Sequence, residues 1–547
     1  MNKQLCVIWL ALLWLPLATS GAVENLNPPN PPLLKGGFST PPLEKGGQGG
    51  FVLNRVQFEG GASLPQTELN AIVAPAIGQR VTLADVEELR YRLTKHYVDQ
   101  GFINSGVVIK PNQTLTDGVL IFQIIPGQLT EIRVSGQERL RPSYLTKRLQ
   151  PDPAAPFNRL KLQDHFQLLL QDPLIAQLKG TLLPGAAPAS AVLDLAVTRA
   201  RAWDVALRTD NHRPPSTGAE RAYLTGTVRN LTGFGDALDL NLGHGYEGDG
   251  REGSISWSVP LTARDTRLAL RYERNDASLI EEPLADLAID SATERLMVEV
   301  SHPLWHTLQS TLRLGAQLSH AENTTHLLGE PFSFSEGVVN GASQVTALRL
   351  SQEYSRRLTQ QAFALRSVFS YGMDALDATI HSGNTPDSRF IAWLGQGQYV
   401  RQLTQHGTQM IVRGSLQLAG ERLLALEQFS IGGAGSVRGY RENQLVGDNG
   451  YTASLEVRHP VWEGVKFFAA KQLLQLAVFT DVGNAWDHGH YSERNGDLWS
   501  IGVGAVWTIE KRLQAELYFG HALNDPPPEK EHDWQDEGVH FMVQVDF

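Results

Sequence analysis

The sequence predicts a mixed fold, in which two small α+β modules are followed by a 16-stranded antiparallel transmembrane β-barrel. Three observations indicate this. An apolar segment at the N-terminus has the features of a secretion signal. Two successive segments then share the element order β-α-α-β-β. The remainder of the chain alternates between apolar and polar residues in one short segment after another, as the strands of a membrane barrel do.

The first 22 residues have the pattern of a signal peptide. Lys3 gives a positive start, and residues 6–17 form an apolar stretch that is too short to span a bilayer. Small residues then allow cleavage after Ser20 or Ala22, with an uncleaved membrane anchor as the alternative. The rest of the chain holds no run of about 18 apolar residues, so a membrane span of the mature protein has to be made of strands.

The composition excludes several classes of protein. The formal net charge is −11, whereas a nucleic-acid binder needs clustered Lys and Arg. The single cysteine, Cys6, lies in the signal, so the mature chain holds no disulfide, thiol nucleophile or thiolate metal site. The hydrolase signatures Gly-x-Ser-x-Gly and His-Glu-x-x-His are absent from the sequence. We therefore expect no enzyme activity, no cofactor and no bound metal ion.

Residues 23–50 are rich in proline and glycine and repeat one short motif. Pro-Pro-Leu-Leu-Lys-Gly-Gly at 31–37 returns as Pro-Pro-Leu-Glu-Lys-Gly-Gly at 41–47. Proline removes backbone donors and glycine raises the entropy lost on ordering, so this segment is predicted to be a flexible linker. A binding role for the repeat is the alternative.

The two modules are expected at residues 51–127 and 128–200. In the first, apolar residues recur at helical spacing between Leu83 and Asp99, and Gly101 follows where that helix should end. The second repeats the same order, which strengthens both assignments. The expected strands cover 52–58, 106–110, 118–125, 129–134, 175–183 and 191–197, and the expected helices cover 65–74, 83–99, 142–149 and 160–170.

Residues 201–547 form the predicted barrel. Between Trp499 and Trp507, every second residue is apolar and the two ends are aromatic, as in a strand that faces lipid on one side and water on the other. A soluble β-sandwich or propeller is the alternative, but such a core needs a second covering sheet. We expect 16 strands, beginning near residues 202, 221, 236, 251, 265, 294, 309, 343, 362, 389, 407, 450, 473, 498, 511 and 539.

Two short motifs in the barrel region stand out. Residues 431–440, Ile-Gly-Gly-Ala-Gly-Ser-Val-Arg-Gly-Tyr, form a glycine-rich loop that carries Arg438; an exposed surface loop is the alternative, and the Lys-Ser/Thr ending of a phosphate-binding loop is missing. Residues 479–483 read Phe-Thr-Asp-Val-Gly. Strand parity places Phe479 and Asp481 on the lumenal face, so Asp481 can pair with Arg438 if the loop folds inward. A water-filled lumen screens such a pair, so we expect it to stabilise the fold by about 1 kcal/mol. A strand-end turn also suits Asp481 and Gly483.

The final strand carries a third motif. From Val539 to Phe547 the residues alternate strictly, with an aromatic residue at the C-terminus. This pattern resembles the signal by which outer-membrane barrels are recognised for insertion, and it assigns that role to Phe547.

These motifs together resemble a known family. Val437–Tyr440 and Phe479-x-Asp481-x-Gly483 are similar to the two signature motifs of two-partner secretion transporters, the haemolysin/haemagglutinin secretion-activation proteins. The paired modules resemble the polypeptide-transport-associated (POTRA) domains of that family. The resemblance covers residues 51–547.

The resemblance implies a function and a site. The implied function is translocation of a large exoprotein, such as a haemolysin or adhesin, across the cell outer membrane, with the POTRA domains in the periplasm. It implies an inward-folded loop whose Arg438 contacts Asp481, with Val437, Gly439 and Tyr440 shaping the loop. The expected partners are the unfolded exoprotein, outer-membrane lipid and the barrel-assembly machinery, and the transporter is expected to be monomeric. A barrel-assembly insertase, a porin and an outer-membrane enzyme are the alternatives.

One departure from the family pattern generates a prediction. Members often begin with a helix that plugs the barrel, but residues 23–50 show no helical periodicity. Deletion of 23–50 should therefore barely change the single-channel conductance measured in planar bilayers. A large and steady rise in conductance would show that this segment does plug the pore.

Overall fold

The structure is a computed structural model that describes residues 50–547 except 62, 114, 116, 151, 249, 465–469, 490–495, 511 and 525–532. The predicted signal peptide, and the predicted linker up to residue 49, lie outside the described residues. The chain divides into two compact units, one ending at Arg201 and one running from Ala202 to Phe547. No helix in the described ranges is long and apolar enough to cross a membrane.

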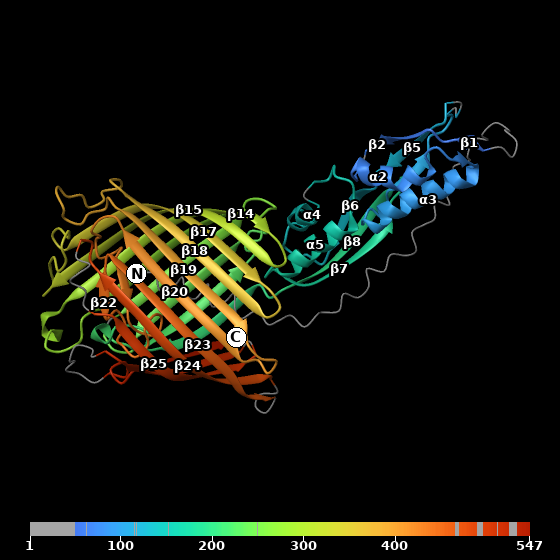
Figure 1. Ribbon diagram of the computed structural model, residues 1–547. Helices are drawn as coiled ribbons and strands as arrows, with labels where there is room; N and C mark the ends of the chain where they lie inside the picture. Colours follow the sequence, from blue (N-terminus) through green and yellow to red (C-terminus); the bar gives the residue numbers. More distant parts are fainter. Residues whose placement is uncertain are drawn as a thin grey trace. The chain divides into compact units, whose positions relative to one another are not determined.

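The first module packs two helices on a three-stranded sheet (Figure 1). Helix α3 begins after a capping box in which the Asp85 carboxylate accepts the backbone N–H of Thr82 at 2.7 Å, a bond that lowers the pKa of Asp85. The apolar face predicted for this helix is buried against the sheet. The elements are β2 (Arg55–Gly60), α2 (Gln66–Val73), the 3-10 turn η1 (Ala74–Ala76), α3 (Leu83–Asp99), β4 (Gly106–Ile109) and β5 (Val119–Ile125), in the sheet order β2-β5-β4.

One small element in this module was not predicted. The strand expected over 52–58 is divided, because Leu53 turns into the core with its side chain fully buried. Its backbone N–H donates to the carbonyl of Gln79 at 3.0 Å. As a result β1 (Phe51–Val52) pairs with β3 (Arg80–Val81) in a separate two-stranded sheet.

The second module repeats the topology of the first. In each, the first long strand runs parallel to the last, which lies at the centre of the sheet, and the remaining strand is antiparallel to it. The repeat inferred from the order of elements is therefore confirmed at the level of strand pairing. The elements are β6 (Gln128–Ser135), α4 (Pro142–Leu149), α5 (Arg159–Leu170), β7 (Ile175–Pro184) and β8 (Ser190–Arg199), in the sheet order β6-β8-β7.

Backbone contacts join the two modules. The carbonyl of Gly101, whose φ of 90° favours glycine, accepts the N–H of Arg159 at 2.8 Å. The side chain of Asn158 caps α5 and also donates to the carbonyl of Gln100 at 2.9 Å. The end of α3 is thus tied to the start of α5, so the two modules are held by more than the single chain that connects them.

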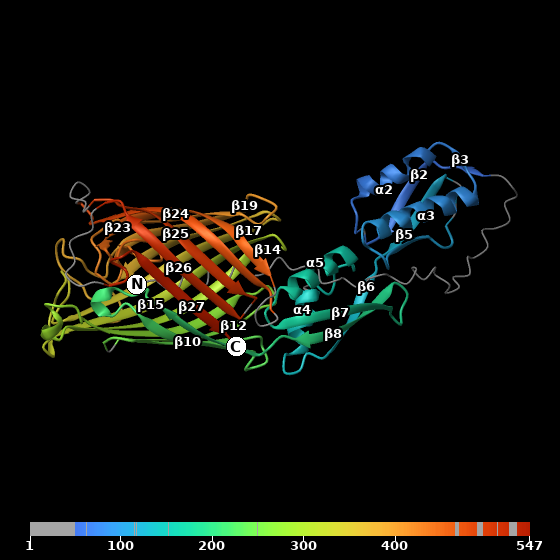
Figure 2. The same cartoon turned by 90° about the horizontal axis from the view of Figure 1, so that it is seen from below.

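The second unit is a closed antiparallel barrel of sixteen long strands (Figures 1 and 2), which confirms the predicted fold. All sixteen begin within four residues of their predicted starts. The two-residue β16 (Glu330–Pro331) is an addition beside β15. The long strands are β9 (Trp203–Asp210), β10 (Arg221–Arg229), β11 (Ala237–Gly245), β12 (Arg251–Pro260), β13 (Arg267–Ser278), β14 (Asp290–His306), β15 (Ser310–Leu327), β17 (Ala342–Arg357), β18 (Gln361–Met373), β19 (Ile391–Gln402), β20 (Gln409–Ala419), β23 (Asn449–Gly464), β24 (Gln472–Trp486), β25 (Leu498–Ile509), β26 (Leu513–Ala522) and β27 (Val539–Asp546), and β9 pairs with β27 to close the ring.

The two faces of the wall have opposite chemistry. On β24, Leu476 and Val478 are 51% and 58% exposed on the outside, whereas Phe479 and Asp481 are buried on the inside. The parity assigned to this strand from the sequence is therefore confirmed. The connections between strands differ in length at the two ends of the barrel. At the end where β9 begins they are short, as at 307–309 and 358–360. At the other end they include long ones, such as 374–390 and 420–448.

Candidate functional site

The glycine-rich motif lies on the long connection between β20 and β23. Two short strands, β21 (Phe429–Ile431) and β22 (Leu445–Gly447), pair to form its neck. Gly432 and Gly433 have φ values of 106° and 87°, which let the chain turn sharply at the start of the tip. Beyond them Val437, Arg438 and Tyr440 are all buried. The loop tip is therefore packed against the barrel wall, and the alternative of an exposed surface loop is wrong.

Arg438 makes a bidentate ion pair with Asp481 of β24. Its Nε donates to Oδ2 at 2.8 Å and its Nη2 donates to Oδ1 at 2.9 Å. The backbone N–H of Arg438 also reaches Oδ2, at 3.1 Å. Three bonds from one residue to one carboxylate fix both the side chain and the loop backbone at this point.

A second carboxylate, which the sequence analysis missed, completes the pairing. Glu456 of β23 accepts from Arg438 Nη1 at 2.6 Å and is itself fully buried. Arg458 bonds the other oxygen of Glu456 and donates from Nη2 to the Tyr518 hydroxyl at 2.8 Å. Two buried guanidinium groups thus face two buried carboxylates in one cluster, and the partly exposed Arg413 approaches Glu456 at 3.8 Å. Strand parity alone places Glu456 on the inner face of the wall, because its neighbour Leu455 faces outward.

The cluster is sealed by aromatic rings. The guanidinium carbon of Arg438 lies 3.5 Å from the centre of the Phe479 ring and 4.8 Å from that of Tyr518. These rings pack edge to face at 5.8 Å. Gly502 and Gly504 of β25 make room for them, since a Cβ at either position would lie 2.3 Å from a ring carbon.

This packing overturns one expectation. A water-filled lumen would screen the Arg438–Asp481 pair, so the sequence favoured a stabilisation of about 1 kcal/mol. The side chains are instead 4% and 0% exposed. The pair is therefore shielded from water, and removal of one partner leaves an uncompensated buried charge.

Gly439 brings the loop backbone against β26 and β27. Its φ is 92°, and a Cβ there would lie 2.9 Å from the carbonyl carbon of Gly520. Its N–H donates to His540 Nε2 at 3.2 Å. Both the conformation and the close approach therefore require glycine at 439.

The other predicted motif residues also meet in this cluster. The Tyr440 hydroxyl lies 3.0 Å from the carbonyl oxygen of Trp499. Val437 packs beside Gly483, where an added Cβ would lie 3.1 Å from a Val437 methyl group. Phe547 lies apart from the loop and is 60% exposed, and its backbone N–H donates to the Val205 carbonyl at 2.9 Å.

Further ties link the loop to the closing strands. Arg441 donates to Asp536 at 2.7 Å and to Glu281 at 2.7 Å. The N–H of Glu442 donates to the side chain of Gln535 at 2.8 Å, and Gln535 donates onward to the Asn211 carbonyl at 2.6 Å. Asn211 follows β9 directly, so the loop is connected to the place where β9 meets β27. No sequence motif marked these residues.

No metal site is evident in the described ranges, where no three His, Cys, Asp or Glu side chains converge. The carboxylates of the loop cluster face guanidinium groups instead, which leaves their oxygens engaged.

Comparison with known proteins agrees with this geometry. The sequence matches the family described as haemolysin secretion/activation protein ShlB/FhaC/HecB over residues 190–506, more than half of the chain. The chain belongs to this family. Residues 51–127 also match the ShlB-type POTRA domain. The resemblance to two-partner secretion transporters is thereby confirmed, and with it the placement in the outer membrane with POTRA domains in the periplasm.

Relatives within the family have transporter names. The outer membrane transporter CdiB of Dickeya dadantii is 23% identical over 87% of this chain and 83% of the relative. The hemolysin transporter protein HpmB of Proteus mirabilis is 23% identical over 84% of this chain and 80% of the relative. The solved CdiB from Escherichia coli has a TM-score of 0.70 at 20% identity, with 93% of each chain covered. BamA from Haemophilus ducreyi lacking POTRA domains 1-3 has a TM-score of 0.54 at 13% identity, with 91% of this chain and 100% of that chain covered. Because the curated relatives are named as transporters, a barrel-assembly function is not favoured.

Arg438→Ala should destabilise the folded protein by about 3–5 kcal/mol, because Asp481 stays buried without its counter-charge, while Glu456 keeps only Arg458 and the more distant Arg413. Arg229→Ala is the control, since its partner Asp204 is exposed and the change should cost at most about 1 kcal/mol. Urea unfolding in lipid vesicles, followed by tryptophan fluorescence, measures both. Equal losses in the two variants would show that the Arg438 pair is screened after all.

Proposed function

We propose that this chain exports one or a few large exoproteins, such as a haemolysin or an adhesin, through the lumen of its barrel. The observation that carries the proposal is the docking of the loop tip by side chains. The tip contacts the wall through Arg438, Gly439 and Tyr440, while the strands of the wall are joined by their own backbone ladder. The loop can therefore move without opening the barrel, as the passage of a polypeptide demands.

Within this proposal the motif residues have distinct roles. Arg438 and Asp481 hold the docked loop, with Phe479 and Gly483 shaping the wall and Val437, Gly439 and Tyr440 shaping the tip. Phe547 serves as the insertion signal read by the barrel-assembly machinery, and the transporter acts as a monomer. The proposed organisation is a signal peptide at 1–22, a linker at 23–50, POTRA domains at 51–127 and 128–200, and the barrel at 201–547.

The POTRA domains are proposed to capture the partner while it is unfolded. Their sheets have the orders β2-β5-β4 and β6-β8-β7, so strands stand at sheet edges in both modules. An extended polypeptide can add to such an edge through backbone hydrogen bonds, which do not depend on its sequence. Because the chain carries no nucleotide-binding motif, folding of the partner outside the cell supplies the direction of transport.

The capture step can be measured directly. Residues 51–200 should bind the unfolded N-terminal part of a candidate exoprotein encoded in the neighbouring reading frame, as measured by calorimetry. The same exoprotein fragment should not bind the barrel at 201–547. Binding to the barrel but not to 51–200 would exclude the POTRA domains as the receptor.

A measurement of export distinguishes a role of the loop in transport from a role in folding. Arg438→Ala and Asp481→Ala should each reduce export severalfold. The barrel should still insert and stay heat-resistant on a gel in spite of the lower stability, because its backbone ladder is intact. The double variant should be little worse than Arg438→Ala alone, since that change already breaks the bonds to Asp481 together with the bond to Glu456. The measured quantity is exoprotein in the medium per folded barrel. Full export by Arg438→Ala would refute the role of the loop, and loss of the folded barrel would make the pair structural.

A further inference from the structure

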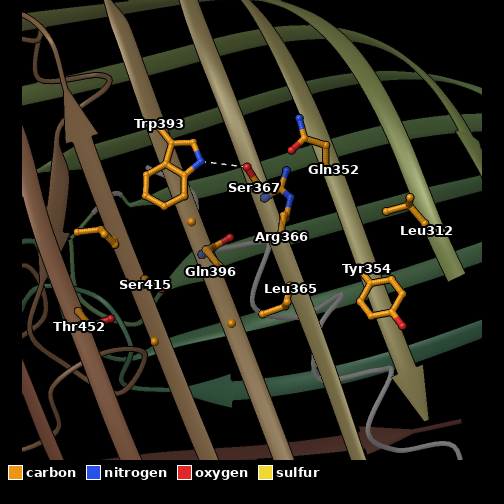
Figure 3. Close-up of a pocket in the computed structure, with 14 residues that line it drawn as sticks. Leu312, Gln352, Tyr354, Leu365, Arg366, Ser367, Trp393, Gln396, Ser415 and Thr452 are labelled. Atoms are coloured by element: carbon orange, nitrogen blue, oxygen red, sulfur yellow. Dashed lines mark hydrogen bonds between the residues drawn. The ribbon is translucent and has the colours of Figure 1, made fainter. Parts of the chain in front are cut away.

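The lipid-facing surface of the barrel is hollowed over strands β15 to β23. The groove has a volume of about 540 Å³ (Figure 3). Most of its lining residues stand at outward positions, in step with Leu365, which is 51% exposed. Its lining is dominated by Leu312, Tyr354, Leu365, Trp393 and Leu416, together with glycines.

Strand register explains the shape of the groove. Leu365 pairs with Gly397, and Gly397 pairs with Gly414, so two neighbouring outward positions carry no side chain. Gly395 adds a third. These three glycines form the floor of the groove. Two rows of large side chains flank the floor, Phe369–Trp393–Leu418 on one side and Phe363–Tyr399–Val412 on the other.

The walls of the groove are fixed, but its floor is open. The Trp393 ring lies over Gly395, where a Cβ would be 2.7 Å from it, and the indole N–H donates to Ser367 at 3.0 Å, as Figure 3 shows. At Gly397 and Gly414 a Cβ would lie 3.3 Å from a Leu365 methyl group and 3.5 Å from the Thr452 carbonyl oxygen. Neither glycine has a positive φ. The backbone therefore does not require glycine there, and the hollow is space that a larger residue could fill.

Two arginines lie just beyond one end of the groove. Arg356 lies two residues after Tyr354 on β17 and pairs with Phe363 in the ladder. Arg401 lies two residues after Tyr399 on β19 and pairs with Gln361. Both arginines therefore share the outward face with these tyrosines. Both are exposed, and neither forms an ion pair with any residue that the structure describes. Arg356 is two residues from Tyr354, so their backbones lie about 7 Å apart along β17.

This end of the groove faces the periplasm. Strands β17 and β19 finish at Arg357 and Gln402, at the end of the barrel where β9 begins after the POTRA domains. The rings of Tyr354 and Phe363 pack at 5.5 Å, and Trp305 packs on Tyr354 at 6.3 Å. Clustered aromatic residues of this kind mark the membrane interface of outer-membrane barrels. The arginines therefore stand at the depth of lipid headgroups.

We propose that the groove binds one acyl chain of an anionic phospholipid from the periplasm-facing leaflet, with the lipid phosphate paired to Arg356 and Arg401. The groove is continuous with the bilayer that surrounds the barrel. Its exposed lining is mainly apolar, with Gln352 and Ser367 as polar side chains at outward positions. The two cations supply the complementary charge where the headgroup would lie. This site is independent of the lumen and of the exported partner.

The test is lipid retention by the full-length protein in detergent, measured by native mass spectrometry with added phosphatidylglycerol or phosphatidylcholine. Wild type should retain one phosphatidylglycerol and release phosphatidylcholine. Gly397→Leu with Gly414→Leu should reduce retention at least tenfold by filling the floor. Arg356→Gln should reduce it about fivefold, and loss of both arginines about 25-fold.

Matched variants identify the site. Gly226→Leu places a side chain on the outer face of β10, where nothing lies within 4 Å, and Arg264→Gln removes an exposed cation from a turn at the same end of the barrel. Both should retain lipid as wild type does. Unchanged retention in the filled variant, equal retention of the two lipids, or preference for lipid A would overturn the proposal. If the leucine variant fails to fold, the arginine variants decide.

Discussion

A guanidinium group excluded from water has to be neutralised where it lies, and this requirement fixes the loop of this transporter to its barrel. Arg438 meets Asp481 and Glu456, which come from adjacent strands. The ladder pairs Ser454 with Asp481 and Glu456 with Phe479, so the two carboxylates and the ring under the guanidinium occupy two successive inward-facing pairs of the ladder. The register of β23 and β24 therefore places the two carboxylates and the ring where the loop can reach them. The loop itself supplies the cation and a backbone that can approach closely.

Closure of the barrel is therefore a condition of the site. The residues that receive the loop come from β23 to β27, and Gln535 joins the same loop to the chain just after β9. The first and last strands share five paired positions, fewer than β26 and β27 share. Beyond the last of these, the Asn211 side chain bonds the Val539 carbonyl and the Phe541 N–H, both at 2.9 Å, and so extends the contact. Loop docking and ring closure thus reinforce one another at one end of the barrel.

The sequence predicted the strands well because their pattern has one physical cause, a wall with lipid outside and polar groups inside. Pieces of two or three residues, such as β1, β3, β21 and β22, carry no period and were not predicted. Motif and parity identified Arg438 and Asp481. His540 and Gln535 escaped because they lie about a hundred residues away in sequence and meet the loop only through closure. The prediction that water screens the Arg438–Asp481 pair was wrong. Strand alternation carries no information on how Phe479 and Tyr518 pack over glycines and exclude water.

The glycines of the wall connect its two faces. A glycine inside a strand removes a side chain from the packed surface, and it admits a close neighbour at that point. On the inner face, aromatic rings lie over Gly502 and Gly504, and the loop backbone lies over Gly520. On the outer face, Gly397 and Gly414 leave a hollow bordered by aromatic residues and open to lipid. The same local rule that seats the loop inside therefore favours a lipid seated outside, because Arg356 and Arg401, which form no ion pair among the described residues, offer a counter-charge to an anionic headgroup beside the apolar hollow.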